Sequence, residues 1–307
     1  MEAVRQARRT PPATTEGIWH VRTRSDSAVL KVVALRDEPG SRWPSAAEPS
    51  HPYYWRREPL AYTSGLLDAL GGGLHAPRVR ACVERPNGSV ALWLEDVSES
   101  GGWSPARLGE VARRLGIAQA ELSIDPPSHQ WLSQGWLRAY VDLRRPLIEA
   151  GGERARALAG DAAATLARLD AAPQTLCHHD LHPANVLGVD ASVVVDWAYC
   201  GLAAVGLDPG VLAADALLDG FVEPSDAHTV ADAVWAGYAN GLATGGLHGA
   251  EAEARWAFVA GTALRLSWLP GYCLQPDVDP ATRDRFDAVI PLLLEWAEAA
   301  RRLPSPA

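Results

Sequence analysis

The sequence has little lysine, no long apolar run and no closely spaced cysteines. None of its apolar stretches approaches the roughly 18 residues that a membrane-spanning helix needs, so we expect no transmembrane helix. The segment Met1–Thr15 is rich in Arg and Pro and lacks the apolar core of a secretory signal, which predicts a cytoplasmic protein. The 4 cysteines include no Cys-x-x-Cys pair, which argues against a disulfide framework or a structural zinc cluster.

Composition and charge narrow the class of protein further. The chain has 307 residues, of which 48% are apolar and 21% charged, a balance typical of a soluble globular protein with room for two lobes. A net charge of −9 argues against nucleic acid as a partner. Residues 1–97 carry a net charge of +2 and residues 98–307 a net charge of −11. The acidic part is either a solvated surface or an attractive field for a cationic ligand; the candidate contacts for its amines are Asp125, Asp142, Asp277 and Asp279.

Lysine is nearly absent, although the chain has 28 basic residues. All of them are Arg except Lys31. An ammonium is a compact point charge, whereas a guanidinium is a planar fork, so the two are not interchangeable where geometry matters. Lys31 is therefore a candidate functional residue from composition alone.

The first part of the chain has the pattern of a sheet with one helix. Four segments alternate apolar and polar residues or flank turn residues such as Asn87-Gly88, and they predict two β-hairpins: 17–24, 28–35, 79–84 and 89–94. Between the hairpins, Tyr54–Leu70 has helical spacing and ends at three glycines. Lys31 falls within the second predicted strand.

The rest of the chain is predicted to be mainly helical. Seven segments have helical periodicity: 105–122, 130–150, 153–169, 211–218, 226–243, 250–268 and 281–302. They are interrupted by a short β segment, Thr175–Trp197. Interruptions of this kind often carry functional residues.

This β segment contains the pattern His-x-Asp-x-x-x-x-Asn, from His178 through Asp180 to Asn185, followed by a β-branched strand that ends in Asp196. Phosphoryl transfer needs a carboxylate that accepts the proton of the attacking hydroxyl, and oxygen ligands that hold magnesium on the nucleotide phosphates. Asp180 suits the first role. Asn185 and Asp196 suit the second.

Phosphoryl transfer also needs a cation on the phosphates, commonly a strand Lys that a helix carboxylate holds in place. Lys31 lies in a predicted strand, and Glu58 is the first carboxylate of the next predicted helix. The chain therefore contains, in this order, a strand lysine, a helix glutamate, a candidate catalytic aspartate, an asparagine and a candidate metal-binding aspartate.

With these residues in this order, the sequence resembles the aminoglycoside phosphotransferase and choline kinase-like family, small-molecule relatives of the protein kinases. The resemblance runs from about Gly17 to the C-terminal helices and is strongest over 176–208, where Asp208-Pro209 matches an Asp-Pro of the family. It implies an α+β, protein-kinase-like, two-lobed fold. Residues 1–97 would form a small N-terminal lobe with an antiparallel sheet and one helix, ending in the hinge. Residues 98–307 would form a mainly helical C-terminal lobe that contains the catalytic loop, 176–197.

The resemblance also implies the role of each residue. Asp180 would be the catalytic base, Asn185 and Asp196 would bind Mg²⁺, and Lys31, oriented by Glu58, would contact the phosphates of ATP or GTP.

Two further parts of the site follow from the same resemblance. The hinge segment Leu94-Glu95-Asp96-Val97 would pair with the nucleotide base through Glu95 and Val97, and His178 would support the catalytic loop. The family covers the phosphates with a loop between its first two strands; here Thr14–Gly17 is the expected position, and no Gly-x-Gly-x-x-Gly precedes Lys31. The first strand is therefore expected to be short or absent.

The implied function is transfer of a γ-phosphoryl group to a hydroxyl of a small molecule, with an antibiotic such as an aminoglycoside as the leading acceptor. The alternatives are a kinase of a metabolic alcohol such as choline, homoserine or a sugar, and a catalytically inactive kinase-like binding protein. A zinc hydrolase is a further reading, because His178 and His182 have helical i, i+4 spacing. Pro183 argues against it, since the residue before a proline avoids the helical region. We expect a monomer or a homodimer.

Overall fold

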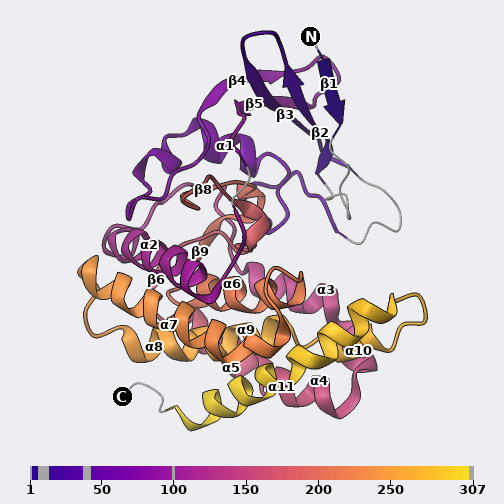
Figure 1. Ribbon diagram of the computed structural model, residues 1–307, viewed down its shortest axis with the longest axis vertical. Helices are drawn as coiled ribbons and strands as arrows, with labels where there is room; N and C mark the ends of the chain where they lie inside the picture. Colours follow the sequence, from indigo (N-terminus) through magenta and orange to yellow (C-terminus); the bar gives the residue numbers. More distant parts are fainter. Residues whose placement is uncertain (1, 6–13, 37–42, 99–100, 304–307) are drawn as a thin grey trace.

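Five antiparallel strands and one short helix form the N-terminal part of the protein, and the rest is mainly helical, with two small two-stranded sheets (Figure 1). The structure is a computed structural model that describes residues 2–5, 14–36, 43–98 and 101–303. The strands are β1 (Glu2–Arg5), β2 (Thr15–Arg22), β3 (Ser27–Val33), β4 (Val79–Glu84) and β5 (Val90–Glu95). Their order in the sheet is β1-β2-β3-β5-β4. We call β1–β5 and the helix α1 the N-lobe, and everything from α2 onward the C-lobe.

Both predicted hairpins of the N-lobe are confirmed. β2 and β3 are joined by a turn in which the backbone N–H of Asp26 donates to Thr23 Oγ1 at 3.0 Å. Lys31 lies in the middle of β3, paired with Ile18 of β2 and Leu92 of β5. A central strand with partners on both sides gives this lysine a fixed backbone.

The expectation about the phosphate-covering loop is wrong in position. Thr15–Gly17 belong to β2, and a first strand exists: the four-residue β1 pairs antiparallel with β2, Glu2 opposite Arg22. The segment that connects the two strands is therefore 6–14, of which 6–13 lie outside the described residues. The segment 6–14 contains no glycine, which is the main sequence signal for a loop, and for this reason the loop was not predicted there.

The predicted helix at 54–70 is divided in two. It consists of α1 (Arg57–Thr63) and a 3-10 turn η1 (Leu66–Ala69), separated by Ser64 and Gly65. The guanidinium of Arg57 is buried and donates to five backbone carbonyls, which belong to Pro49, His51, Pro52, Trp131 and Ala198, at 2.7–3.4 Å. Two of these carbonyls belong to the C-lobe, so Arg57 fixes α1 against it. Burial lowers the pKa of Arg57 to about 10.

The C-lobe contains the predicted helices with some changes of boundary. Its helices are α2 (Pro105–Ile124), α3 (Trp136–Ala150), α4 (Gly152–Ala159), α5 (Ala162–Ala171), α6 (Leu207–Leu218), α7 (Ala227–Thr244), α8 (Glu251–Trp256), α9 (Thr262–Arg265), α10 (Leu269–Cys273) and α11 (Pro280–Arg302). The single helix expected at 153–169 is wrong: it is broken at Gly160, and Asp161 caps α5. The helix expected at 250–268 is interrupted by a π-helical turn, η5 (Ala257–Gly261).

Two small two-stranded sheets flank the loop that contains Asp180 and Asn185. β6 (Gln174–Cys177) pairs with β9 (Gly201–Ala204), and β7 (Val186–Leu187) pairs with β8 (Val193–Val194). Beneath them α2 packs tightly on α7, because a Cβ at Gly116 would lie 2.4 Å from the carbonyl oxygen of Tyr238. This close approach brings Gln119 of α2 beside Tyr238 of α7. In the part of the chain that the structure describes, no helix is both long and apolar enough to cross a membrane.

Arg57 gives the fold a testable dependence on one side chain. Arg57→Met should lower the free energy of unfolding by about 3 kcal/mol, because the carbonyls that it satisfies would be buried without donors. Arg56→Met is the matched control: Arg56 pairs with Glu84, which is 70% exposed, and lies over the ring of Trp55, and an exposed ion pair of this kind contributes at most about 1 kcal/mol. Urea denaturation of both variants checks the prediction, and equal losses would contradict it.

Candidate active site

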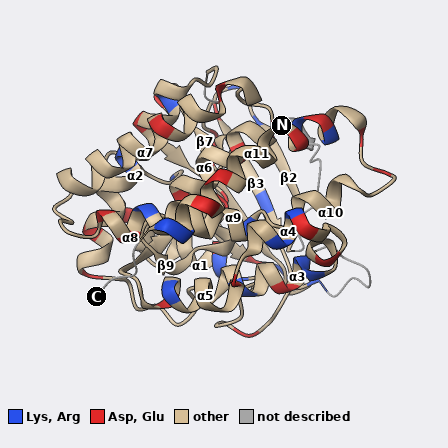
Figure 2. Ribbon diagram, turned by 90° about the horizontal axis from the view of Figure 1, so that it is seen from below, with Lys and Arg blue, Asp and Glu red and all other residues tan. Residues whose placement is uncertain are grey.

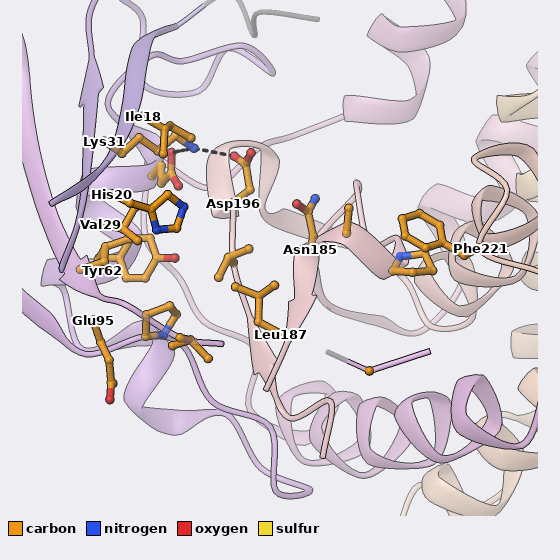
Figure 3. A pocket seen from close by; sticks show the side chains of 18 of the residues that line it. Ile18, His20, Val29, Lys31, Tyr62, Glu95, Asn185, Leu187, Asp196 and Phe221 are labelled. Carbon is orange, nitrogen blue, oxygen red and sulfur yellow. Dashed lines mark hydrogen bonds and ion pairs between the residues drawn. The ribbon is translucent and has the colours of Figure 1, made fainter. Parts of the chain in front are cut away.

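A cavity of about 390 Å³ separates the N-lobe sheet from the small two-stranded sheets of the C-lobe (Figure 3). Its apolar walls come from Ile18, Val29 and Leu94 of the sheet on one side and from Leu187 and Val195 on the other. Polar groups line one end of it. A slot with apolar faces and a few polar groups suits a flat heteroaromatic ring with a charged tail.

Lys31 lies at the polar end of this cavity, between two carboxylates. Its Nζ is 2.5 Å from Glu58 Oε2 and 2.8 Å from Asp196 Oδ1. Lys31 and Glu58 are almost completely buried, whereas the side chain of Asp196 is 18% exposed and lines the cavity. The structure therefore brings together three residues that are far apart in the sequence, from β3, α1 and the end of β8. Asp196 has a left-handed backbone, with φ +66°, which ends the strand beside the ammonium.

The loop 178–185 presents Asp180 and Asn185 on the C-lobe side. The amide nitrogen of Asn185 donates to the backbone carbonyl of Asp180 at 2.9 Å and lies 3.1 Å from Nε2 of His182. His178 is buried: its Nε2 is 2.9 Å from the carbonyl oxygen of Val195, and its Nδ1 accepts the backbone N–H of Asp180 at 3.3 Å. His178 thus connects the backbone of the loop to the strand that precedes Asp196. The side chain of Asp180 is 33% exposed, so a ligand can reach it.

The donor set of Asn185 and Asp196 fits a hard divalent cation. Both residues line the cavity, and because the nitrogen of Asn185 is engaged, its oxygen is the atom left to face the cavity on the side of Asp196 (Figure 3). Oxygen ligands of this kind suit Mg²⁺, which takes a few protein ligands and completes its shell with phosphate and water. Among the residues that the structure describes, no three His, Cys, Asp or Glu side chains are grouped to hold a metal. His182 is extended, with φ −136° and ψ 165°, as Pro183 predicts, so the zinc reading has no support.

Glu95 and Val97 line the opposite end of the cavity. The Glu95 carboxylate turns away from it and pairs with Arg78 at 3.2 Å, so only the Glu95 backbone faces a ligand. Within the described ranges, the backbone N–H of Val97 donates to no protein acceptor. His20 and Asp96, 3.2 Å apart, connect β2 with the hinge segment beside this backbone.

The structure also shows residues around Asp180 that sequence reasoning missed. Arg265 Nη2 lies 3.3 Å from Asp180 Oδ1, and Arg265 Nη1 donates to Asp215 Oδ2 at 2.9 Å. On the other side, His182 lies 3.9 Å from Asp180 and 3.7 Å from Asp219. The sequence suggested His182 only as a zinc ligand, and no spacing in it points to Arg265, Asp215 or Asp219, because α6 and α9 have the pattern of ordinary packed helices.

Aromatic side chains form a wall beside this charged group. Trp136 stacks on Tyr140 and on His179, with ring centroids 4.9 and 5.1 Å apart, and Tyr199 lies 5.8 Å from Trp136. The guanidinium of Arg144 continues the wall over the rings of Trp43, Tyr140 and Trp268. Several of the tryptophans therefore gather near one face of the loop rather than only in the core.

Two of the carboxylates suggested as amine contacts from charge alone are engaged in local interactions. Asp142 pairs with Arg145, and Asp279 caps α11 by accepting the N–H of Thr282. Figure 2 shows acidic and basic residues interspersed along the C-lobe helices. Local pairs such as Arg301 with Glu298 therefore neutralise part of the acidic charge. The half-exposed Asp219 is the acidic side chain that the structure adds beside Asp180.

Comparisons with known proteins agree with this geometry. Residues 18–256 match the sequence model of the phosphotransferase enzyme family, abbreviated APH. Because the match covers most of the chain, the protein belongs to this phosphotransferase family. No curated protein sequence matches the chain.

Solved structures share the protein-kinase-like fold at low sequence identity. An amicoumacin kinase in complex with AMP-PNP, Ca²⁺ and Ami has a TM-score of 0.62 and 11% identity, covering 95% of this chain and 88% of its own. An aminoglycoside phosphotransferase from Alicyclobacillus acidocaldarius has a TM-score of 0.55 and 16% identity, with coverage of 97% and 91%. A choline kinase from Cryptosporidium parvum has a TM-score of 0.55 and 11% identity, with coverage of 98% and 89%. The predicted α+β, two-lobed fold is confirmed.

The setting of Asp219 predicts a pH-dependent stability. Partial desolvation of this half-exposed carboxyl, together with the nearby carboxylate of Asp215, raises the pKa of Asp219 to about 6. A carboxyl whose pKa is higher in the folded state than in the unfolded state destabilises the fold once it is ionised. Asp219→Asn should therefore raise Tm, with a gain that grows between about pH 4 and pH 6 and stays constant above. Thermal melts of the wild-type protein and of Asp219→Asn across this pH range test the prediction. A difference in Tm that shrinks with rising pH would contradict it.

Proposed function

We propose that the protein transfers the γ-phosphoryl group of ATP or GTP, with Mg²⁺, to a hydroxyl of a small-molecule acceptor. The observation that carries the proposal is the meeting of Lys31 with both Glu58 and Asp196 at one end of an apolar slot, one loop away from Asp180. A buried ammonium between two carboxylates is a costly arrangement. The arrangement has a functional explanation when Lys31 contacts the nucleotide phosphates and Asp196 binds the metal ion that accompanies them.

In this proposal each residue has one role in the reaction. Lys31 contacts the nucleotide phosphates and is oriented by Glu58. Asp180 orients the acceptor hydroxyl and takes its proton while the oxygen forms a bond to the γ-phosphorus and the bond to the β-phosphate oxygen breaks. Most of the rate enhancement then comes from position and from the neutralisation of charge.

Asn185 and Asp196 would hold the magnesium ion, which when bound neutralises charge on the phosphates. The apolar walls take the nucleotide base, and the backbone of Glu95 and Val97 pairs with its edge. His178 keeps Asp180 and the strand of Asp196 in register. Residues 1–97 thus form the nucleotide lobe up to the hinge, and residues 98–307 carry the catalytic loop and the acceptor site. Such an enzyme works in the cytoplasm, where nucleoside triphosphates are available.

An antibiotic such as an aminoglycoside is the acceptor that we favour. The half-exposed carboxylate of Asp219, close to Asp180 through His182, supports an acceptor that carries amino groups as well as hydroxyls. A metabolic alcohol such as choline, homoserine or a sugar is the alternative, and the chain would then not be a resistance enzyme.

Transfer of label from γ-labelled ATP or GTP tests the proposal. The purified protein with Mg²⁺ is offered aminoglycosides, other hydroxyl-bearing antibiotics, choline, homoserine and sugars. We expect label on one acceptor class, and we expect Asp180→Ala to lower turnover at least about 100-fold while nucleotide affinity stays nearly unchanged.

The matched control for this variant is Asp190→Ala. Asp190 lies in the turn between β7 and β8, where its carboxylate accepts the hydroxyl of Ser192 at 2.7 Å, and its loss should leave turnover unchanged. Full activity of Asp180→Ala would overturn the assignment of the base. Tight nucleotide binding with no transfer and no slow hydrolysis of the nucleotide would favour a catalytically inactive binding protein.

A further inference from the structure

Arg265 is a buried cation shared between two carboxylates. Its side chain is 7% exposed; Nη1 donates to Asp215 Oδ2 at 2.9 Å and Nη2 to Asp180 Oδ1 at 3.3 Å. Asp215 is also largely buried, with its side chain 13% exposed. Three segments far apart in the sequence, the catalytic loop, α6 and α9, thus meet at a single guanidinium.

The plane of this guanidinium is held by more than its ion pairs. Its Cζ lies 5.4 Å from the ring centroid of Tyr140 and 5.8 Å from that of Trp136, both on α3 and both buried. A planar fork confined by rings and bonded through two different nitrogens has little freedom to rotate. The oxygen of Asp180 that it binds is correspondingly fixed.

The backbone around Arg265 is built irregularly. The helical rod that starts at α8 changes to the π-helical turn η5 before α9, and Arg265 is the last residue of α9. A π-helical turn shifts the register of the side chains that follow, and such turns occur frequently at functional sites. Against this rod, α6 packs at Gly210, where a Cβ would lie 2.0 Å from Thr262 Oγ1. This close approach brings Asp215 of α6 within reach of Arg265.

We propose that Arg265, itself oriented by Asp215, is a positioning residue for the proposed catalytic base Asp180. It binds one carboxylate oxygen, so that the other is directed to the acceptor hydroxyl. Asp215 gives the guanidinium a second fixed point. The inference rests on the proposed function, because it needs Asp180 to act on an acceptor.

The test compares Arg265→Met and Arg265→Lys in the label-transfer reaction. Arg265→Met should lower kcat about 10- to 100-fold, because a small misplacement of a catalytic group has effects of this size, while nucleotide affinity stays within twofold. Arg265→Lys should recover part of the lost kcat. In an Asp180→Asn background, Arg265→Met should change the residual rate less than twofold, because its action passes through Asp180.

Arg255→Met is the matched control. Arg255 lies on the same helical rod, is stacked over Trp235 and Phe258 and does not line the cavity, so its loss should leave kcat unchanged. Asp215→Asn leaves Arg265 in place but weakens its second fixed point, and it should lower kcat in the same direction. This variant decides the question if Arg265→Met does not fold.

The outcomes separate this inference from the proposed function. If the wild-type protein transfers label and both Arg265→Met and Asp215→Asn keep full kcat, Arg265 does not position the base. A loss of equal size in the Asp180→Asn background, or an equal loss in nucleotide affinity, would also overturn the inference and indicate general structural damage. A wild-type protein that transfers no label to any acceptor would overturn the proposed function itself and this inference with it.

Discussion

The carboxylate of Asp208 holds the catalytic loop in place, and the rest of the site depends on it. Asp208 is buried at the start of α6 and accepts the backbone N–H groups of His178 and His179 at 2.7 and 2.9 Å and the side-chain amide of Gln119 at 3.0 Å. Burial raises the pKa of this carboxyl, whereas the N–H donors and the guanidinium of Arg265 act against the rise. His179 can then adopt a left-handed backbone, with φ +67°, and turn the chain toward Asp180.

The Asp208 contacts extend into the helical core. Gln119 accepts the hydroxyl of Tyr238 at 2.6 Å, and this hydroxyl in turn accepts the N–H of Gly206 at 3.0 Å, two residues before Asp208. A chain of buried polar groups in which each member has a partner is rigid, and an incomplete one is costly. The glycine contact between α2 and α7 is therefore part of the site, because it sets the distance between Gln119 and Tyr238.

The N-lobe depends on a second pair of neighbours, Arg57 and Glu58. One turn of α1 carries both the arginine that binds carbonyls of the C-lobe and the glutamate that binds Lys31. Any displacement of α1 that separates Glu58 from Lys31 also breaks the bonds of Arg57. The position of the ammonium at the cavity is thus coupled to the contact between the lobes.

The sequence predicted the parts of the fold that have a local signal. Both hairpins, the helical C-lobe and the spacing of Asp180, Asn185 and Asp196 follow from periodicity, turn residues and a short motif, and the single lysine drew attention to Lys31. The break at Gly160 was missed because a single glycine in a polar helical pattern does not by itself indicate a helix end. The π-helical turn adds one residue within an apolar helix, and the first strand has only four residues, so neither leaves a distinct periodicity in the sequence. The charged residues around Asp180, namely Arg265, Asp215 and Asp219, could not be predicted from the sequence for another reason: only the tertiary packing brings them together.

That packing gives the two oxygens of Asp180 different surroundings. Oδ1 faces a guanidinium that is buried, stacked and bonded a second time to Asp215, whereas Oδ2 is the atom nearest to His182, at 3.9 Å, beyond direct hydrogen-bond distance. A carboxylate held firmly at one oxygen keeps the other in a defined direction, here on the side of His182 and Asp219. Under the proposed function, an acceptor must therefore bring its hydroxyl to Asp180 on the side of His182 and Asp219, a stricter condition than either the motif or the net charge imposes.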